Sequence, residues 1–406
     1  MFKSLMFLTI AAIVNTASAK VNNFFVHITD AHVDMQYKPG SAANCLVGDK
    51  LGTHCCREYS IPIKPYRKAN QWGDYNCDSP PLLVNKTIEW ISKMDPPPDF
   101  IIYTGDSPGH HDITQTVKKN WNAINFVTEQ LYRFKRVYPN IGNHDTWPVD
   151  QLLPPPNNHY LTSFLAKIWS PWVNDTNLAN YGYYSIMISQ DPPVKLISLN
   201  TLYFDKHNLL IKHSSDNIGN QWSWFEKELQ LSDQANQTIW LIGHVYPGNG
   251  EAMTVYTEAM ISLMQKYSDL IRYQFWGHSH DDFHFVYPNK TGSGWVTPSI
   301  MPDDHFPAFR VYEYDPTTMT ILNYIQYTAN LTTTFATNLL HFTPEYDALS
   351  SYNLPDMESK SWVDLYYKLY KNATLFQNYY SHYKTEHQTT ACNSTCQTSF
   401  LDGLMV

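Results

Sequence analysis

Short runs of apolar, aromatic and β-branched residues alternate with stretches of helical periodicity along this chain. Runs of this length and composition predict buried strands. We expect them at residues 24–29, 100–104, 136–138, 181–188, 194–200, 238–242, 273–276, 309–314 and 320–327. Because strands that alternate with helices build largely parallel or mixed sheets, the pattern predicts an α/β fold with helices on the sheet faces.

Two helical stretches carry a clear apolar face. The first face consists of Trp222, Phe225 and Leu229. The second consists of Val255, Ala259, Leu263 and Tyr267, extended by Met260 and Met264. Beyond about residue 331 the pattern changes to tyrosine-rich helical and loop segments. We therefore predict a main domain over residues 20–330 and a small, mostly helical C-terminal subdomain over residues 331–406.

The first nineteen residues have the pattern of a secretory signal peptide. Lys3 gives a positive start, residues 5–14 form an apolar run, and Ala17-Ser18-Ala19 fits a cleavage motif. The run is too short to span a bilayer, which needs about 20 residues. No later segment approaches that length, so we expect no transmembrane anchor. The mature protein is expected to be secreted, or lysosomal, after removal of residues 1–19.

Composition and charge narrow the classes of function. The chain has 28 Lys and Arg against 37 Asp and Glu, a net charge of −9, and 43% hydrophobic residues. This balance describes a compact globular chain and argues against a nucleic-acid partner, which requires a basic face. Sequons for N-linked glycans predict a glycoprotein. They lie at Asn85, Asn174, Asn236, Asn289, Asn330, Asn372 and Asn393.

The six cysteines fit an exported protein with disulfide bonds. Four of them lie near the start of the chain, and Cys392 and Cys396 would close a small loop near its end. In the first group, adjacent Cys55 and Cys56 are not expected to bridge each other. Two pairings remain open, 45–55 with 56–77 and 45–56 with 55–77. A zinc knuckle at His54-Cys55-Cys56 is a weak rival, because its spacing matches no standard site.

Metal-ligand residues follow five of the predicted strands, often after a glycine that lets the backbone turn sharply. These motifs are Asp30-Ala31-His32, Gly105-Asp106, Gly142-Asn143-His144-Asp145, Gly243-His244 and Gly277-His278-Ser279-His280. In open α/β sheets the carboxyl ends of the strands line the ligand crevice. Imidazoles and carboxylates are good zinc ligands, and an amide oxygen can complete a site. The ordered set of motifs therefore predicts a centre for two Zn²⁺ ions.

Our assignment divides these ligands between two ions that share one carboxylate. The first ion is held by Asp30, His32 and His280, and the second by Asn143, His244 and His278. Asp106 bridges them. Each ion then has four protein ligands and an open position for a shared water, as in two-metal hydrolases.

The five motifs, in this order, resemble the calcineurin-like metallophosphoesterase superfamily over about residues 24–315. The segments at residues 72–80 and 142–151, and the Cys392–Cys396 pair, are similar to acid sphingomyelinase and its relatives. The resemblance implies a β-sandwich flanked by helices, with the catalytic domain at residues 20–330. It also implies the disulfides 45–55, 56–77 and 392–396.

Two departures refine the resemblance. Only four residues separate Ala19 from the first predicted strand, which leaves no room for a saposin-like lipid-presenting module. The chain is thus similar to the saposin-less branch of the family, whose substrates include nucleotides and CDP-alcohols. Purple acid phosphatases carry a tyrosinate ligand three residues after the bridging Asp, where this chain has Gly109. A redox-silent zinc pair is therefore expected.

The resemblance implies a phosphodiesterase that uses metal-activated water. His144, beside Asn143, is the first candidate for protonating the leaving group, with Asp145 orienting its ring. His110 resembles the family's second non-ligand histidine and would contact the phosphate or share the acid role. Alternatively, it is only a structural partner of Asp106. Competing functions are cleavage of sphingomyelin to ceramide and phosphocholine, and a non-catalytic secreted binding protein on the same scaffold.

Overall fold

The computed structural model describes residues 23–46, 55–110, 115–211, 217–248, 250–302, 304–385 and 391–406. The predicted signal peptide lies outside them. The strands are β1 (Phe24–Ile28), β2 (Cys45–Leu46), β3 (Ile61–Pro62), β4 (Ile101–Tyr103), β5 (Val137–Pro139), β6 (Tyr184–Gln190), β7 (Pro193–Ser198), β8 (Thr238–Ile242), β9 (Ile271–Trp276), β10 (Phe283–Val286), β11 (Ser293–Val296), β12 (Ala308–Asp315), β13 (Thr320–Thr328) and β14 (Thr343–Asp347). The α-helices are α1 (Pro81–Ser92), α2 (Val117–Leu131), α3 (His159–Ile168), α4 (Thr176–Tyr181), α5 (Gln221–Gln234), α6 (Thr254–Tyr267), α7 (Leu331–Thr337), α8 (Ala348–Tyr352), α9 (Ser359–Leu369), α10 (Ala373–Tyr383) and α11 (Ser394–Asp402).

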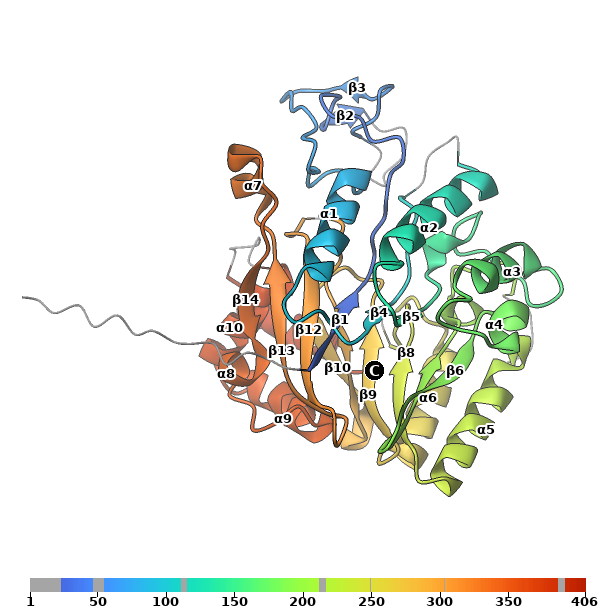
Figure 1. The fold of residues 1–406 in the computed structure, drawn as a ribbon. Coiled ribbons are helices and arrows are strands. Elements are labelled where there is room, and N and C mark those ends of the chain that lie inside the picture. The colour runs from blue at the N-terminus through green and yellow to red at the C-terminus, as the bar shows by residue number, and fades with distance from the viewer. Residues whose placement is uncertain are drawn as a thin grey trace, which may run out of the picture.

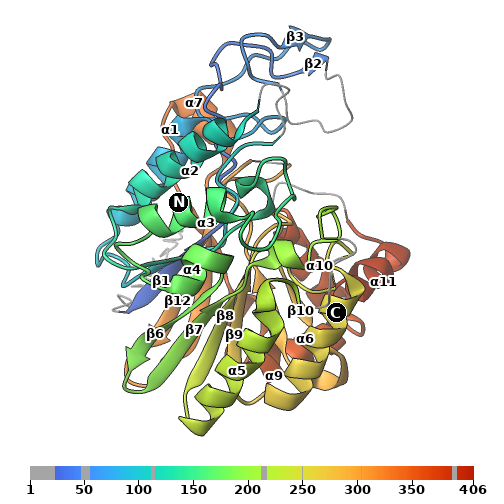
Figure 2. The same ribbon diagram turned by 90° about the vertical axis from the view of Figure 1, so that its right-hand side faces the viewer.

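Two six-stranded sheets form a sandwich (Figures 1 and 2). The first sheet has the order β14-β13-β12-β1-β4-β5, and the second has the order β10-β11-β9-β8-β7-β6. In the first sheet β1, β4 and β5 run parallel, with β5 at the edge, and in the second sheet β7, β8, β9 and β11 run parallel. Antiparallel strands complete both sheets. The α/β class and the β-sandwich are thus confirmed.

An aromatic core fills the space between the sheets. Phe25 on β1 stacks on Phe100 and Tyr312, with ring centroids 4.6 and 4.9 Å apart. It also meets Trp240 of β8 and Phe275 of β9 from the second sheet. Stacked and edge-on rings of this kind combine a large buried area with a favourable geometry. Since β1 is buried on both faces, its sequence is an uninterrupted apolar run apart from one histidine.

Helices cover the outer faces of the sandwich. Helices α1 and α2 pack with β1 and β4 in a second apolar cluster outside the first sheet (Figure 1). Helices α5 and α6 cover the second sheet (Figure 2). The predicted face of α5 is largely right, because Phe225 and Leu229 are fully buried. The predicted face of α6 is partly right: Met260, Met264 and Tyr267 are buried, but Tyr256 is buried as well and Val255 is 39% exposed.

The C-terminal region packs against the sandwich. Helix α9 contacts β10 and β11, and Trp362 of α9 is buried beside Trp295 of β11. The mostly helical character predicted for this region is right, with one exception. Residues 343–347 form β14, which pairs antiparallel with β13 and lengthens the first sheet. Its sequence, TPEYD, lacks the alternation that would have marked it as a strand.

Disulfides brace the segment between β1 and α1. The bonds Cys45–Cys55, Cys56–Cys77 and Cys392–Cys396 are present, so the implied pairing is confirmed. Because Cys55 and Cys56 are both in disulfides, the zinc knuckle is wrong. The first two bonds hold residues 35–46 and 55–77, which we call the disulfide lobe. This lobe carries β2 and β3 and projects beyond the sandwich at the top of Figure 1.

Candidate metal centre

The carboxyl ends of strands from both sheets meet at one place. The loops after β1, β4 and β5 come from the first sheet, and those after β8 and β9 come from the second. Their polar side chains gather into a buried cluster, which we call the metal cluster. It contains all seven residues predicted as ligands, namely Asp30, His32, Asp106, Asn143, His244, His278 and His280.

The distances within the metal cluster separate two groups around one shared carboxylate. Potential ligand atoms of Asp30, His32 and Asp106 lie within 4.8 Å of one another, and so do those of Asp106, His244 and His278. Asp106 Oδ2 lies 3.4 Å from His32 Nε2 and 3.1 Å from His244 Nε2. Asp106 thus occupies the position between the two groups.

The remaining members approach the groups to which we assigned them. His280 Nε2 lies 3.0 Å from His32 Nε2 and 3.5 Å from Asp30 Oδ1. Asn143 Oδ1 lies 2.9 Å from His244 Nε2 and 3.1 Å from His278 Nδ1. The atoms that converge here are imidazole nitrogens, carboxylate oxygens and one amide oxygen. The same donors are well suited to surround cations.

The backbone at the metal cluster is held in an uncommon conformation. Five members have a positive φ: Asp30 at 49°, His32 at 38°, Asp106 at 59°, His278 at 78° and His280 at 66°. Left-handed backbone is rare for residues other than glycine and persists only where the surroundings enforce it. Here the packing of the strand ends enforces this left-handed conformation. As a result, the loops after successive strands turn their side chains into the same space.

Two glycines allow the strand ends to approach closely. A Cβ atom at Gly142 would lie 2.1 Å from Asp106 Oδ1, and one at Gly277 would lie 2.1 Å from Thr29 Oγ1. Any side chain at either position would push one motif away from the next. These glycines therefore serve the contact between neighbouring loops, in addition to the turn that the sequence suggested.

Hydrogen bonds outside the metal cluster fix the orientation of its side chains. His32 Nδ1 lies 3.0 Å from Pro108 O, and His244 Nδ1 lies 2.6 Å from Thr104 O. Each contact leaves Nε2 as the nitrogen that faces the cluster. Asn143 Nδ2 donates to Asp150 Oδ1 at 2.8 Å, which turns the amide oxygen inward. Such outer contacts are typical of metal-binding histidines.

The charges of the metal cluster call for a cation. Burial opposes ionisation of Asp30, but nearby His244 and His280 outweigh it, so the pKa of Asp30 lies well below its usual value. The pKa of Asp106 is lowered in the same way, with His244 the strongest influence against burial. For His244, Asp106 and Asp30 together overcome burial and raise the pKa to about 9. A proton on His244 thus offsets only part of the charge of the two carboxylates.

The donor set fits divalent metal ions. Asp30 Oδ1 is buried and accepts no hydrogen bond from any described residue, although three histidine nitrogens lie 3.5–3.9 Å away. A buried carboxylate oxygen without a hydrogen bond is costly unless a cation occupies the space that it faces. The mixture of imidazole, carboxylate and amide ligands agrees with this interpretation.

Two further histidines line the cleft above the metal cluster. The His110 ring stacks on His32 with centroids 4.1 Å apart, and the His144 ring lies 4.5 Å from that of His110. His110 Nδ1 lies 2.7 Å from Asp78 Oδ1. His110 therefore pairs with Asp78, and not with Asp106 as the structural alternative supposed. Asp78 lies in the segment 72–80 that resembles the family, but no role was predicted for it, because the fold brings it to His110 from 32 residues away.

The predicted role of Asp145 is wrong. Its carboxylate accepts hydrogen bonds from the backbone N–H groups of Gly142 at 2.8 Å, Ser107 at 3.0 Å and Asp106 at 3.2 Å. It thus ties two strand-end loops together and does not orient the His144 ring. His144 Nδ1 is buried and bonds to no described residue. Burial is also the main reason why the pKa of His144 lies well below its usual value.

Sequence reasoning also missed Glu251. Its carboxylate contacts His278 Nε2, which leaves Nδ1 of that ring to face Asn143. Glu251 lies in the loop between β8 and α6, outside every strand-end motif. The only signal in the sequence was an acidic residue in the loop after His244, which is too common to have been informative.

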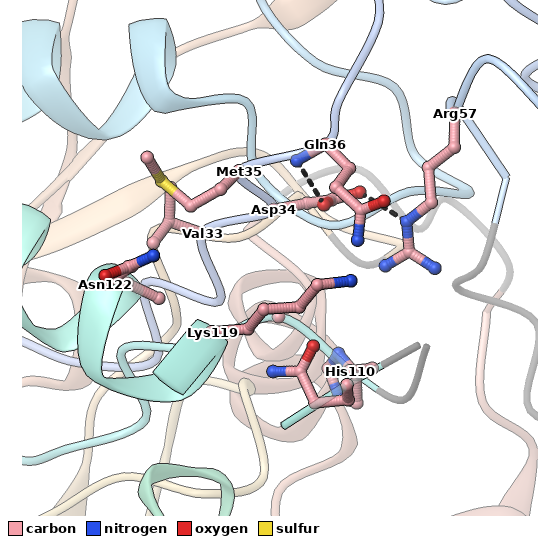
Figure 3. Close-up of a pocket in the computed structure, with 11 residues that line it drawn as sticks. Val33, Asp34, Met35, Gln36, Arg57, His110, Lys119 and Asn122 are labelled. Carbon is pink, nitrogen blue, oxygen red and sulfur yellow. Dashed lines mark hydrogen bonds and ion pairs between the residues drawn. The ribbon is translucent and has the colours of Figure 1, made fainter. Parts of the chain in front are cut away.

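Two cavities meet at His110. One, of about 370 Å³, opens over the metal cluster and is lined by Asp106, His144 and His278 among others. The second, of about 220 Å³, lies beside it and is lined by Gln36, Arg57 and Lys119 among others. Figure 3 shows these three polar side chains converging on the second cavity above His110. Because His110 lines both, the two cavities are neighbours.

A search of the described residues for a membrane-spanning helix found none that is both long and apolar enough.

Comparisons with known proteins identify the family. The family described as calcineurin-like phosphoesterase matches residues 25–282, and the acid sphingomyelin phosphodiesterase C-terminal region matches residues 284–406. The chain is 31% identical to sphingomyelin phosphodiesterase 2 of Caenorhabditis elegans over 90% of its own length. It is 30% identical to sphingomyelin phosphodiesterase A of Dictyostelium discoideum over 93%. It spans 65% of the length of each of these relatives.

A third relative is matched over more of its length. The chain is 30% identical to the cyclic GMP-AMP phosphodiesterase SMPDL3A of Bos taurus, over 92% of this chain and 86% of the relative. The two family matches together cover the sandwich, the metal cluster and the C-terminal helices. This chain therefore belongs to the acid sphingomyelinase-like family of calcineurin-like phosphoesterases.

Proposed function

We propose that this protein is a secreted, zinc-dependent phosphodiesterase that hydrolyses phosphodiester or phosphoanhydride bonds in small substrates of the nucleotide or CDP-alcohol type. The observation that carries the proposal is the position of Asp106 Oδ2 between His32 Nε2 and His244 Nε2, at 3.4 and 3.1 Å. The names of the relatives, which include cyclic GMP-AMP and sphingomyelin phosphodiesterases, support the reaction class.

In this proposal two Zn²⁺ ions are held as the sequence predicted, with Asp30, His32 and His280 on one, Asn143, His244 and His278 on the other, and Asp106 shared. When bound, such ions neutralise phosphoryl oxygens and lower the pKa of a water molecule toward 7. The surrounding residues keep the ligands in place. Glu251 and Asp150 orient His278 and Asn143, and backbone carbonyls orient His32 and His244.

The two histidines above the metal cluster supply proton transfer and phosphate contact. Asp78 is fully buried, and His110, Arg57 and His32 hold its pKa below the usual value against the effect of burial. His110 Nδ1 faces Asp78, so Nε2 is the ring nitrogen that is left to contact a phosphoryl or leaving-group oxygen. His144 lies beside it and is neutral before substrate binds. It would take up the proton that it later donates when the negative charge of the bound phosphodiester favours the protonated ring. We assign protonation of the leaving group to His144 and His110 together.

The second cavity gives one substituent of the phosphodiester a place to bind. Its lining of amides, two cations and one carboxylate suits a polar group. The substituent would pass His110, which lines both cavities, while the phosphoryl group stays over the metal cluster.

Sphingomyelin is the second candidate substrate, with ceramide and phosphocholine as products. It is favoured by the names of two relatives matched over at least 90% of this chain. Secretion with N-linked glycans is part of the proposal as well. It is supported by three disulfides, which persist in oxidising compartments, and by the sequons.

The test is a side-by-side assay of the purified glycosylated protein on CDP-choline, ATP, bis-p-nitrophenyl phosphate and sphingomyelin micelles, with and without a chelator. We expect turnover of the soluble substrates, loss of activity on chelation and recovery on adding Zn²⁺. Inactivity on all four substrates with zinc bound would instead support the non-catalytic binding protein.

A further inference from the structure

The outer part of the disulfide lobe exposes large apolar side chains. Leu46, Ile61 and Tyr66 are 65%, 62% and 70% exposed, and Ile63 is exposed too. Residues 61–68 are all exposed, with the sequence IPIKPYRK. Scattered exposed apolar residues are ordinary, but a group of them on one small element marks a contact surface.

The pairing of β2 with β3 places three of these side chains together. Leu46 lies opposite Ile61 in an antiparallel register, and Ile63 donates its backbone N–H to Asn44 O at 3.1 Å. Directly opposed residues share one face of a ribbon, and so do residues two apart on one strand. Leu46, Ile61 and Ile63 therefore form one apolar face, which we call the outer face of the lobe.

The opposite face of the ribbon is already filled. Cys45 and Ala43 belong to a buried cluster with Tyr37, Cys55, Cys56, Ala69 and Cys77. An isolated two-stranded ribbon has little stability of its own, but two disulfides hold this one in place. The lobe is thus a braced support with one face packed inward, while the described apolar side chains of the other face are exposed.

The charge around the outer face is opposite in sign to that of the whole chain. The described lobe carries five basic residues and two acidic ones, in a protein whose net charge is −9. Arg57 and Arg67 are paired with Asp34 and Asp74. Lys38, Lys64 and Lys68 are exposed and form no ion pair with any described residue. Exposed lysines beside apolar and tyrosine side chains are typical of surfaces that lie on anionic lipid.

Two features argue against other occupants. Pro62 and Pro65 lack a backbone N–H, so this edge cannot pair fully with a strand from a second copy or another protein. None of the seven sequons falls within the lobe, whereas they are spread over the rest of the chain. Glycans would therefore not hold a flat membrane away from this face.

We propose that the outer face of the disulfide lobe is a membrane-contact surface that docks on anionic phospholipid bilayers. Leu46, Ile61, Ile63 and Tyr66 enter the interface, and Lys64 and Lys68 lie among the headgroups. The lobe stands at the same end of the sandwich as the carboxyl ends of β4, β8 and β9, so docking brings the metal cluster toward the lipid (Figure 1). The proposal goes beyond the proposed function, because docking does not require turnover.

The experiment is co-sedimentation of the full glycosylated chain with vesicles of equal parts phosphatidylcholine and phosphatidylserine, and with vesicles of phosphatidylcholine alone. We expect binding to the anionic vesicles that weakens as salt is raised. The triple variant Ile61→Ser/Ile63→Ser/Tyr66→Ser should bind roughly a hundredfold more weakly. Lys64→Gln/Lys68→Gln should bind roughly thirtyfold more weakly, because each lysine near an anionic surface contributes about a fivefold gain in affinity.

A matched control changes one exposed leucine and one exposed lysine far from the lobe, as Leu322→Ser/Lys167→Gln. It should bind as the parent does. Turnover of bis-p-nitrophenyl phosphate should be the same in all variants, which shows that each is folded and separates docking from catalysis.

Three outcomes would overturn the proposal. These are no binding of the parent chain to anionic vesicles, equal binding to phosphatidylcholine alone, and full binding by the triple serine variant. Self-association that the triple variant abolishes, without vesicle binding, would assign the face to a second copy instead. If the chain binds vesicles but hydrolyses nothing, the proposed function fails and the docking surface stands.

Discussion

In the metal cluster, charged side chains are buried and the apolar core lies behind them, whereas in the disulfide lobe large apolar side chains face outward and cystines fill the inside. The metal cluster is held by packing between strand ends, with backbone N–H groups bonded to Asp145. The lobe is held by covalent bonds. The metal cluster requires donor atoms placed to within fractions of an ångström, and the packed sandwich provides that precision. The outer face of the lobe only has to stay exposed, and disulfide bonds are sufficient for that.

The two regions touch at one point. Cys56 and Cys77 are joined, and the residues that follow them, Arg57 and Asp78, lie 3.6 Å apart. Asp78 in turn holds His110 beside the metal cluster. The covalent brace of the lobe thus sets the position of a carboxylate that acts on the cleft.

The largest expected effect is that of Asp106→Asn. An amide cannot replace a carboxylate shared by two ions, so we expect loss of bound metal and a fall in turnover on the order of ten-thousandfold. Elemental analysis and phosphodiester hydrolysis measure the two effects. Asp315→Asn, at the end of β12, is the control and should keep both. Retention of two ions in Asp106→Asn would refute the bridging role.

His144→Ala should lower turnover by roughly a thousandfold and leave the metal content unchanged. His144 Nδ1 has no described hydrogen-bond partner, so its removal leaves no buried group unsatisfied. The exposed His159, changed to alanine, is the control. Near-normal activity in His144→Ala would assign proton donation to His110 alone, and His110→Ala should then show the full loss.

Cys56→Ser/Cys77→Ser tests the point where the lobe meets the cleft. Opening a loop of 21 residues should lower the free energy of unfolding by about 3 kcal/mol. Turnover should fall as well, because Asp78 loses its anchor. Cys392→Ser/Cys396→Ser opens a much shorter loop far from the cleft and should leave turnover unchanged. Equal effects of the two pairs on turnover would show that the lobe does not position Asp78.

The smallest effect concerns pH. Burial lowers the pKa of His382 to about 4, and Tyr352 hydrogen-bonds to its ring at 2.9 Å. Since the unfolded chain takes up this proton first, stability is complete above the unfolded pKa and falls as pH drops through about 6.5 toward the folded value. The contribution lost from pH 7 to pH 5 is about 2 kcal/mol.

Urea denaturation at the two pH values measures this loss, and His382→Gln should make the difference smaller by the same amount. His284, whose pKa burial lowers to about 3, gives a second titrating group in the same region. An unchanged pH dependence in His382→Gln would show that this ring is already accessible to protons in the folded state.

Much of the fold could be predicted because the strands are buried on both faces. The range expected for β8, residues 238–242, coincides with Thr238–Ile242, since the apolar run stops at Gly243. The sequence also predicted that the residues at the strand ends lie close together. Strands that run parallel present their carboxyl ends at one edge, and both sheets contribute such strands here.

What the sequence did not reveal depends on contacts between distant segments. Asp78 reaches His110 only because the disulfide lobe folds back, and Glu251 reaches His278 from a loop without a motif. Asp145 looked like a partner for its neighbour His144, but its carboxylate is more stable among three backbone amides. The face of α6 was only partly predicted, because apolar residues occur on several sides of that helix and only packing selects Tyr256 over Val255.

The C-terminal helices are fastened to the loop that carries His278 and His280. Just beyond this loop, Asp281 forms an ion pair with Lys384 at 2.5 Å, and Asp282 donates its backbone N–H to Tyr383 O at 3.0 Å. A chain truncated between the two family matches, near residue 283, would leave both aspartates without these partners. Exchanging the C-terminal part with that of a relative would therefore alter the loop that carries His278 and His280. A chimaera should take Asp281 and Asp282 from the same protein as Tyr383 and Lys384.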